Sequence, residues 1–216
     1  MYINTENYYD IKKYVTQKNI TLVAVSKTKP VAAIQALYNL GQRDFGENYV
    51  QELVEKQAQL PNDIRWHYIG HLQSNKVKLI LPIVHLIHGV DTQKLLQSIQ
   101  KEANKLGIIA NCLLQVHIAT ESTKFGLTAT EINNILSESK TYTNVHIKGL
   151  MGMASNTTNE GQIATEFESI YSLQQQYANS NLPLATLSIG MSGDYKIAAQ
   201  HGATMVRIGS LLFGSR

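Results

Sequence analysis

A buried strand and the turn after it are encoded by residues 20–27, ITLVAVSK. The stretch is apolar without a clean alternation of polar residues, which is typical of a parallel strand covered on both faces. Pro30 follows it where the first turn of a helix tolerates proline, and Gly41 stands where such a helix would stop. Between them Ile34 and Leu37 recur at helical spacing. This part of the chain therefore predicts a strand followed by a helix.

Further apolar runs follow along the chain, and nearly every one precedes a turn signal and a segment with helical spacing. A strand–helix unit repeated eight times predicts an α/β protein that folds as a single (β/α)₈ TIM barrel. A doubly wound open sheet is the structural alternative. The predicted strands are Ile20–Val25, Asp44–Gly46, Ile64–Ile69, Leu86–Val90, Cys112–Ile118, Val145–Met151, Leu184–Ile189 and Met205–Ile208.

Several helix starts are marked by polar residues. Thr128 with Glu131, and Thr157 with Glu160, have the spacing of a capping box, in which a hydroxyl and a carboxylate satisfy each other's free amides. Asp91 directly precedes another segment of helical spacing and is expected to begin it. These signals place helices between the predicted strands.

The end of the chain requires an additional element. Only eight residues follow Ile208, which is too few for a full helix after the eighth strand. Near the start of the chain, Tyr8, Ile11, Tyr14 and Val15 recur at helical spacing. We expect this segment to form an extra N-terminal helix that covers the gap beside the eighth strand.

Length and composition narrow the class of protein. The 216 residues, of 24.1 kDa, predict one domain over residues 1–216. The 19 Lys and Arg against 16 Asp and Glu are scattered, so neither a nucleic-acid nor a membrane partner is expected. The longest apolar run, residues 79–84, is broken by Pro82 and is too short to cross a bilayer. One cysteine, Cys112, and an N-terminus without a targeting pattern suit a cytoplasmic protein, which we expect to be a monomer.

Unusual polar residues stand at the predicted carboxyl ends of the strands, where barrels of this kind carry their chemistry. Lys27 directly follows the first strand, where partial burial favours the neutral amine that a Schiff base needs; a solvated surface lysine is the alternative. Gly209 and Ser210 follow the eighth strand and Ser192 the seventh, where free amides and hydroxyls would bind phosphate. Ser192 could instead be a plain N-cap and Gly209 a plain turn residue. Barrel closure would bring Lys27 to this loop, and together they would hold a phosphorylated aldehyde, either pyridoxal 5′-phosphate or a sugar phosphate.

Two more polar residues have alternative roles. Arg207 lies on the eighth strand itself, so it could donate to the pyridine nitrogen at the barrel mouth, or it could form an internal ion pair. Asn48 ends the second strand and could donate to the ring hydroxyl, or it could cap the next helix with Gln51. The candidate cofactor-binding residues are therefore Lys27, Asn48, Ser192, Arg207, Gly209 and Ser210.

Several stretches together carry a specific resemblance. They are residues 24–28 (AVSKT), 45–52 (FGENYVQE), 66–76 (WHYIGHLQSNK), 124–126 (KFG), 149–153 (GLMGM), 188–194 (SIGMSGD) and 206–216 (VRIGSLLFGSR). In this order they resemble the pyridoxal phosphate homeostasis protein family, whose barrel is similar to the N-terminal domain of alanine racemase. The resemblance implies pyridoxal 5′-phosphate bound as an aldimine to Lys27, with phosphate contacts from Ser192, Gly209 and Ser210 and with Arg207 near the ring nitrogen.

The resemblance also implies a role in vitamin B6 homeostasis, in which the protein supplies or buffers the cofactor for pyridoxal-phosphate-dependent apoenzymes without established catalytic turnover. A fold-type III enzyme, an amino-acid racemase or decarboxylase, is the alternative. Racemisation in the relative needs a further domain, for which a chain consumed by one barrel leaves no residues. A class I aldolase acting through Lys27 is a third hypothesis, but no acid or base is obvious beside this lysine.

Other polar residues are expected to play lesser parts. Tyr49 and His71 could lie near the barrel mouth, but structural roles are expected for both. Lys29 and Lys124 could handle the cofactor in transit or lie on a solvated surface. No metal site is expected, because no His-Glu-x-x-His or paired-cysteine pattern occurs in the sequence.

Overall fold

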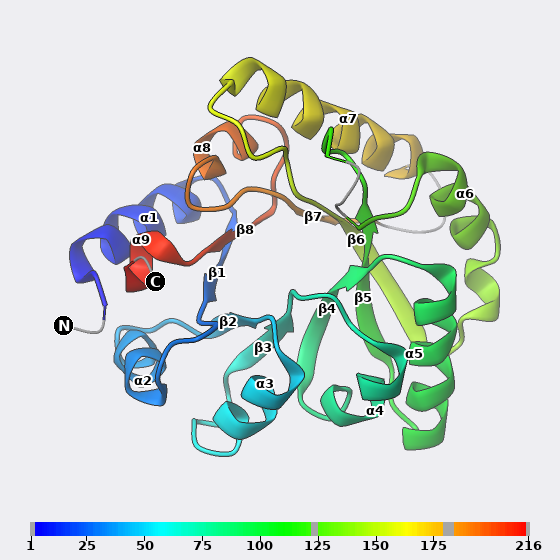
Figure 1. The fold of residues 1–216 in the computed structure, drawn as a ribbon, viewed down its shortest axis with the longest axis horizontal. Coiled ribbons are helices and arrows are strands. Elements are labelled where there is room, and N and C mark those ends of the chain that lie inside the picture. Colours follow the sequence, from blue (N-terminus) through cyan, green and yellow to red (C-terminus); the bar gives the residue numbers. More distant parts are fainter. Residues whose placement is uncertain (1–2, 122–124, 179–183, 215–216) are drawn as a thin grey trace.

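Eight parallel strands form a closed barrel in the computed structural model, which describes residues 3–121, 125–178 and 184–214 (Figure 1). Each strand pairs with the next along the chain, and β8 pairs with β1, with Val23 opposite Arg207. The predicted TIM barrel is confirmed, and this last pairing excludes an open sheet. The strands are β1 (Thr21–Val25), β2 (Asp44–Glu47), β3 (Arg65–Tyr68), β4 (Val84–Val90), β5 (Ala110–Val116), β6 (Val145–Gly152), β7 (Thr186–Ser188) and β8 (Met205–Ile208).

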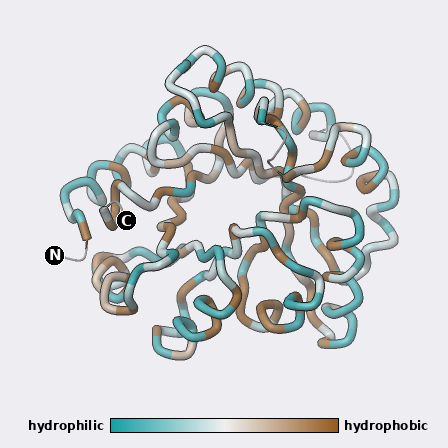
Figure 2. Tube along the Cα trace, viewed as in Figure 1, coloured by the Kyte–Doolittle hydropathy of each residue, from teal (hydrophilic) through white to brown (hydrophobic). Residues whose placement is uncertain are grey.

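Helices surround the barrel and connect its strands (Figure 1). Hydrophobic and hydrophilic residues alternate along them (Figure 2), as expected of helices that pack one face on a sheet. In the described part of the chain, no helix is long and apolar enough to cross a membrane. The helices are α1 (Thr5–Gln17), α2 (Val31–Asn39), α3 (Val50–Gln57), η1 (Ser74–Lys76), α4 (Val77–Ile80), α5 (Gln93–Leu106), α6 (Ala129–Ser137), η2 (Ser139–Thr141), α7 (Glu160–Ala178), α8 (Tyr195–Ala198) and α9 (Ser210–Phe213).

The expected N-terminal helix is present as α1. It buries Tyr8, Ile11 and Val15 and lies beside the short α9 at the other end of the chain (Figure 1). Two hydrogen bonds join these segments: the Asn4 amide donates to the Leu212 carbonyl at 2.7 Å, and the Asn7 side chain donates to the Leu211 carbonyl at 3.0 Å. Helix α1 thus packs against the segment that follows β8, as the sequence predicted.

The helix caps agree with the sequence in part. The Thr128–Glu131 capping box is confirmed. The predicted Thr157–Glu160 box is wrong, because α7 begins at Glu160 and the Asn159 side chain accepts the hydrogen bond from the Gln162 amide. The start expected at Asp91 is also displaced by one residue, since the Thr92 hydroxyl accepts from the Leu95 amide. Asp91 instead pairs with His71.

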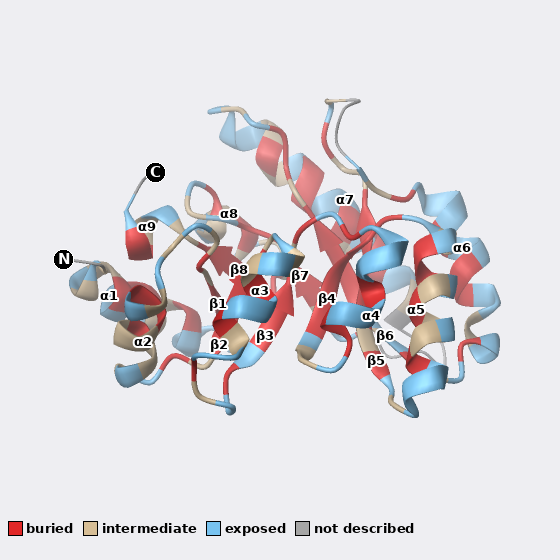
Figure 3. Ribbon diagram, turned by 60° about the horizontal axis from the view of Figure 1, so that its bottom comes forward, coloured by how far each residue is buried: buried red, intermediate tan, exposed pale blue. Residues whose placement is uncertain are grey.

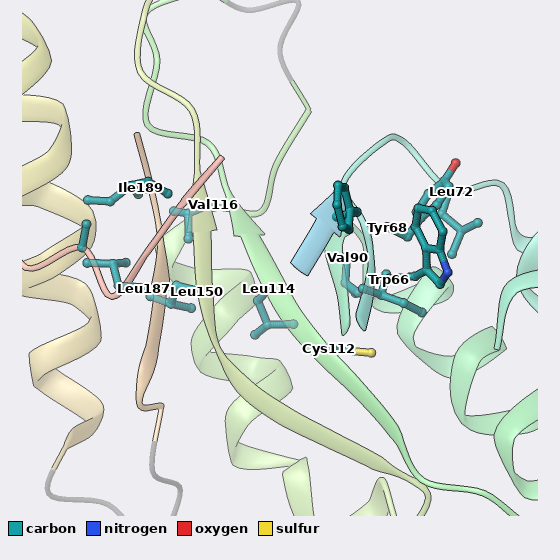
Figure 4. Packing of buried hydrophobic residues seen from close by; sticks show 14 of the residues in the cluster. Trp66, Tyr68, Leu72, Val90, Cys112, Leu114, Val116, Leu150, Leu187 and Ile189 are labelled. Carbon is teal, nitrogen blue, oxygen red and sulfur yellow. The ribbon is translucent and has the colours of Figure 1, made fainter. Parts of the chain in front are cut away.

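The apolar core has two parts. The larger one lies between the strands and the surrounding helices; Figure 4 shows part of it, including Leu114 on β5, Leu150 on β6 and Leu187 on β7. Figure 3 shows the buried strands in red and the exposed outer helix faces in pale blue. A smaller cluster lies inside the barrel, because its side chains point to the face of the strands opposite to the one that packs on the helices. Its members are Val23, Leu86, Leu113, Met151 and Met205.

Candidate functional site

A cavity of about 350 Å³ lies at the carboxyl ends of β1, β2, β7 and β8. Its lining includes all six residues predicted from the sequence, which come from four separate parts of the chain. Closure of the barrel between β8 and β1 brings them together. They are Lys27, Asn48, Ser192, Arg207, Gly209 and Ser210.

Lys27 is half-buried in the loop after β1, so it is not a freely solvated surface lysine. The residue on each side of it is held by a cluster of side chains from β2 and α3. The Lys56 ammonium donates to the Ser26 carbonyl at 2.7 Å, and the Thr28 amide donates to Glu52 at 2.6 Å. Thr28 has φ +63°, a conformation that a residue with a side chain adopts only when its surroundings hold it there. The loop therefore presents Lys27 to the cavity in a constrained conformation.

The cluster behind this loop consists of Glu47, Glu52 and Lys56, which the sequence reasoning missed. The Lys56 ammonium also donates to Glu47 at 2.7 Å and to Glu52 at 2.6 Å, and Glu47 accepts from the Ser26 hydroxyl at 2.6 Å. Burial raises the pKa of Glu47, although Lys56 and Ser26 act in the opposite direction. The i, i+4 spacing of Glu52 and Lys56 on one helix was the sequence signal available.

Ser192 and Gly209 meet at the other side of the cavity. The Gly209 amide donates to the Ser192 hydroxyl at 3.3 Å. A Cβ on Gly209 would approach the Val25 carbonyl oxygen to 3.3 Å, so the backbone passes close to β1 here. The N-cap alternative for Ser192 is wrong, since α8 begins only at Tyr195. No carboxylate is among the described residues that line the cavity, so these hydroxyls and amides are suited to an anion such as phosphate.

Arg207 is only 4 % exposed and lies on the barrel wall. One guanidinium nitrogen, Nη1, donates to the Ser188 carbonyl and hydroxyl, both at 2.7 Å, and Nη2 donates to the Gly152 carbonyl at 3.0 Å. The ion-pair alternative is wrong, because no carboxylate of the described residues lies within 4 Å of this guanidinium. Burial lowers the pKa of Arg207 to about 10, and the more distant Asp194 acts against this effect. Two of its five N–H donors have no acceptor in the described protein and remain for a ligand.

Asn48 lines the same cavity and does not cap α3. The first residue before that helix is Tyr49, which makes no side-chain capping bond, and Gln51 instead donates to Glu55. The Asn48 side-chain oxygen is buried without a hydrogen-bond partner among the described residues. Buried oxygens are rarely left unpaired, so an added donor such as a ligand hydroxyl would fit here.

The remaining sequence candidates lie elsewhere or are already engaged. Tyr49 and His71 line a separate groove over α3 and η1, where His71 pairs with Asp91 at 2.8 Å. Lys29 donates to the Phe213 and Gly214 carbonyls, each at 3.2 Å, although it also lines the cavity. Lys124 lies outside the described residues. The described ranges contain no cluster of histidine, cysteine and carboxylate side chains that could hold a metal ion.

The fold and the position of the cavity define a class of protein. Residues 5–216 match the sequence profile of the alanine racemase N-terminal domain family. The pyridoxal phosphate homeostasis protein of Aquifex aeolicus is 38% identical, over 90% of this chain and 86% of that protein. That of Vibrio alginolyticus is 36% identical, over 100% of this chain and 95% of that protein.

Similarity in structure leads to the same group. PipY of Synechococcus elongatus, solved with pyridoxal phosphate bound, has a TM-score of 0.89 and is 34% identical, covering 97% of this chain and 99% of that one. The chain belongs to the pyridoxal phosphate homeostasis protein family.

Proposed function

We propose that this protein binds pyridoxal 5′-phosphate as a Schiff base on Lys27 and acts in vitamin B6 homeostasis. The observation that carries the proposal is the cavity itself, which combines a half-buried amine, a hydroxyl–amide pair and a buried guanidinium with two remaining donors. These groups match the aldehyde, the phosphate and the ring nitrogen of the cofactor. The bound cofactor in PipY, a relative of nearly equal length, supports this assignment.

Each group of the cavity has a defined part in this proposal. The neutral Lys27 amine adds to the aldehyde carbon, and one water molecule leaves as the carbon–nitrogen double bond forms. Ser192, Gly209 and Ser210 bind the phosphate, which favours backbone amides and hydroxyls. The Asn48 side chain pairs with the ring hydroxyl through its otherwise unpaired oxygen.

Arg207 makes the bound cofactor a weak catalyst. An arginine only donates hydrogen bonds and keeps its proton, so it leaves the pyridine nitrogen unprotonated and the ring a poor electron sink. Apart from Lys27 and Lys29, no described residue that lines the cavity offers an acid or base side chain, since none is Asp, Glu, His, Tyr or Cys. A racemase or decarboxylase needs an acid or base at the reacting carbon, and so does an aldolase. Both features favour a cofactor-holding protein over an enzyme.

The residue that binds the cofactor is tested with two matched variants, Lys27→Arg and Lys29→Arg. Both replace a lysine of the same cavity by a cation that forms no Schiff base. Borohydride reduction of the wild-type protein and of Lys29→Arg should fix a pyridoxyl-phosphate adduct that peptide mass spectrometry places on Lys27. Loss of the adduct is expected in Lys27→Arg alone. A colourless wild-type protein without an adduct would refute the proposal.

The homeostatic role predicts transfer of the cofactor, in the cytoplasm and by a monomer, to pyridoxal-phosphate-dependent apoenzymes. The loaded protein should activate such an apoenzyme faster than Lys27→Arg mixed with the same amount of free cofactor. Incubation with D- and L-amino acids at catalytic protein concentrations should give no sustained racemisation or decarboxylation. Sustained turnover of either kind would establish the enzyme alternative instead.

A further inference from the structure

A polar layer crosses the barrel interior below the cavity. Asp44, His67, His88, Ser188 and Arg207 are all buried, with exposed fractions between 0 and 6 %. Barrels of this class usually fill this space with branched aliphatic side chains. Buried polar groups lower stability unless they are hydrogen-bonded, so the contacts of this layer require an explanation.

At its upper end the layer begins with Arg207. The guanidinium donates to the Ser188 hydroxyl at 2.7 Å, and the same hydroxyl lies 3.1 Å from His88 Nδ1. Because arginine only donates, the Ser188 oxygen accepts from Arg207, and its own proton is free to point to His88. Burial lowers the pKa of His88 well below its usual value, and the positive charge of Arg207 acts in the same direction. His88 is therefore neutral, with one nitrogen as acceptor.

At its lower end the layer stops at Asp44. Burial alone would raise the pKa of this carboxyl, but hydrogen bonds from His67 and Arg65 outweigh burial and lower the pKa to about 2. Arg65 binds both carboxylate oxygens, at 2.7 and 2.5 Å. The carboxylate can only accept, so His67 Nε2, at 3.0 Å, carries a proton.

The hydrogen-bond directions at Arg207 and at Asp44 determine the direction of the hydrogen bond between the two histidines. His67 Nδ1 and His88 Nε2 are 2.9 Å apart, and one proton lies between them. If His88 Nε2 donates this proton, His88 Nδ1 accepts from Ser188, and every polar side-chain hydrogen of Ser188, His88 and His67 has an acceptor. The reverse direction would leave the buried Ser188 hydroxyl with two donors and no acceptor. The satisfied arrangement runs one way, from Arg207 through Ser188, His88 and His67 to Asp44.

We propose that Ser188, His88 and His67 are positioning residues, which hold the Arg207 guanidinium through a one-way hydrogen-bond chain anchored on Asp44. The chain occupies one donor of Arg207 without bringing a carboxylate to it, so the full positive charge stays beside the cavity. This inference rests on the proposed function only for what the remaining two donors bind.

The direction of the chain is measurable without any cofactor. Nitrogen-15 NMR of the histidine side chains in the cofactor-free protein should show His67 and His88 as neutral rings, each with its proton on Nε2, at about pH 7. A proton on Nδ1 of His88, or a doubly protonated ring at either position, would overturn the proposed direction. This measurement stands even if the protein binds no pyridoxal phosphate.

The positioning role is tested with Ser188→Ala, which removes the hydroxyl. We expect its dissociation constant for pyridoxal phosphate to rise about tenfold and the absorption maximum of the bound cofactor to shift with a changed pH profile. Ser188→Thr keeps the hydroxyl and should restore the wild-type spectrum. Met205→Leu, an apolar change on the same inner face of β8, controls for altered packing and should leave the spectrum unchanged.

The outcomes separate this inference from the proposed function. A wild-type spectrum and affinity in a folded Ser188→Ala protein would overturn the positioning role while cofactor binding stands. If Ser188→Ala does not fold, Ser188→Cys conserves the volume and offers only a weak hydrogen-bonding group. Its spectrum should then be shifted from that of the wild-type protein, and a wild-type spectrum would again contradict the proposal.

Discussion

The buried Lys56 ammonium donates a 2.7 Å hydrogen bond to the carbonyl of Ser26, the residue directly before Lys27. A side chain of helix α3 thereby determines the path of the loop after β1. Lys56 also bonds two carboxylates, Glu47 and Glu52, of which Glu52 accepts from the Thr28 amide on the other side of Lys27. The orientation of the proposed Schiff-base lysine thus depends on residues that do not line the cavity with it.

Replacing Lys56 by methionine should destabilise the protein. Removal of one partner leaves the buried Glu47 carboxylate uncompensated, which typically costs about 3–5 kcal/mol. Urea denaturation of Lys56→Met should show this loss, together with a lower affinity for pyridoxal phosphate. Lys105→Met removes the exposed ion pair with Glu102 and should change stability little. Equal effects of the two substitutions would contradict the proposed role of the buried cluster.

Acid should weaken the fold through Asp44. The pKa of this carboxyl is lowered from 3.8 to about 2 in the folded protein, so the folded state favours the carboxylate. Its stabilisation is complete above the unfolded pKa and is lost as the pH falls from about 4 through 2, which amounts to about 2 kcal/mol. Asp44→Asn should lack this part of the pH dependence when stability is measured by denaturation between these pH values. If the stability of Asp44→Asn falls with pH as steeply as that of the wild-type protein, the proposed stabilising role of the Asp44 contacts is wrong.

A methyl group at Gly209 should weaken phosphate binding. The added Cβ would come within 3.3 Å of the Val25 carbonyl and displace the amide that bonds Ser192. We expect Gly209→Ala to lower the affinity for pyridoxal phosphate about tenfold and that for pyridoxal, which has no phosphate, much less. Gly193→Ala is the matched control, because a Cβ there meets no atom within 4 Å. An equal loss of affinity for pyridoxal phosphate and for pyridoxal would show that the phosphate does not bind at Gly209.

Removing apolar packing from α1 should loosen the end of the barrel. Ile11 is 3 % exposed, and its replacement by alanine should lower the free energy of unfolding by about 2–5 kcal/mol. Because α1 contacts α9, which begins at Ser210, cofactor affinity should fall as well. Lys13→Ala changes an exposed position of the same helix and serves as the control for both measurements. A wild-type affinity for pyridoxal phosphate in the folded Ile11→Ala protein would show that the packing of α1 does not affect the cofactor site.

Much of the barrel was predictable because strands and helices follow from local patterns. The predicted runs coincide with all eight strands, with ends that differ by up to two residues, and helical spacing near the start of the chain indicated α1. The caps were less predictable, as Asn159 and Thr92 show, since several neighbouring polar residues can serve one helix start.

The candidate site was predictable to the extent that barrel closure dictates it. Once β8 pairs with β1, Lys27 and Gly209 must lie at the same end of neighbouring strands. The roles of two site residues could not be predicted in this way. Whether Asn48 caps a helix or lines a cavity depends on atoms far away in the sequence, and so does the presence of a carboxylate beside Arg207.

The sequence by itself determined the eight strand–helix units and the residues at the strand ends, because these depend on near neighbours along the chain. Only the tertiary structure decided the contacts across the barrel. His88 and Ser188 are 100 residues apart, and they meet because closure turns both side chains into one interior. Likewise, Lys56 reaches Ser26 only when α3 packs against β2, the strand that pairs with β1. No local pattern encodes such contacts, since each partner alone reads as an ordinary polar residue.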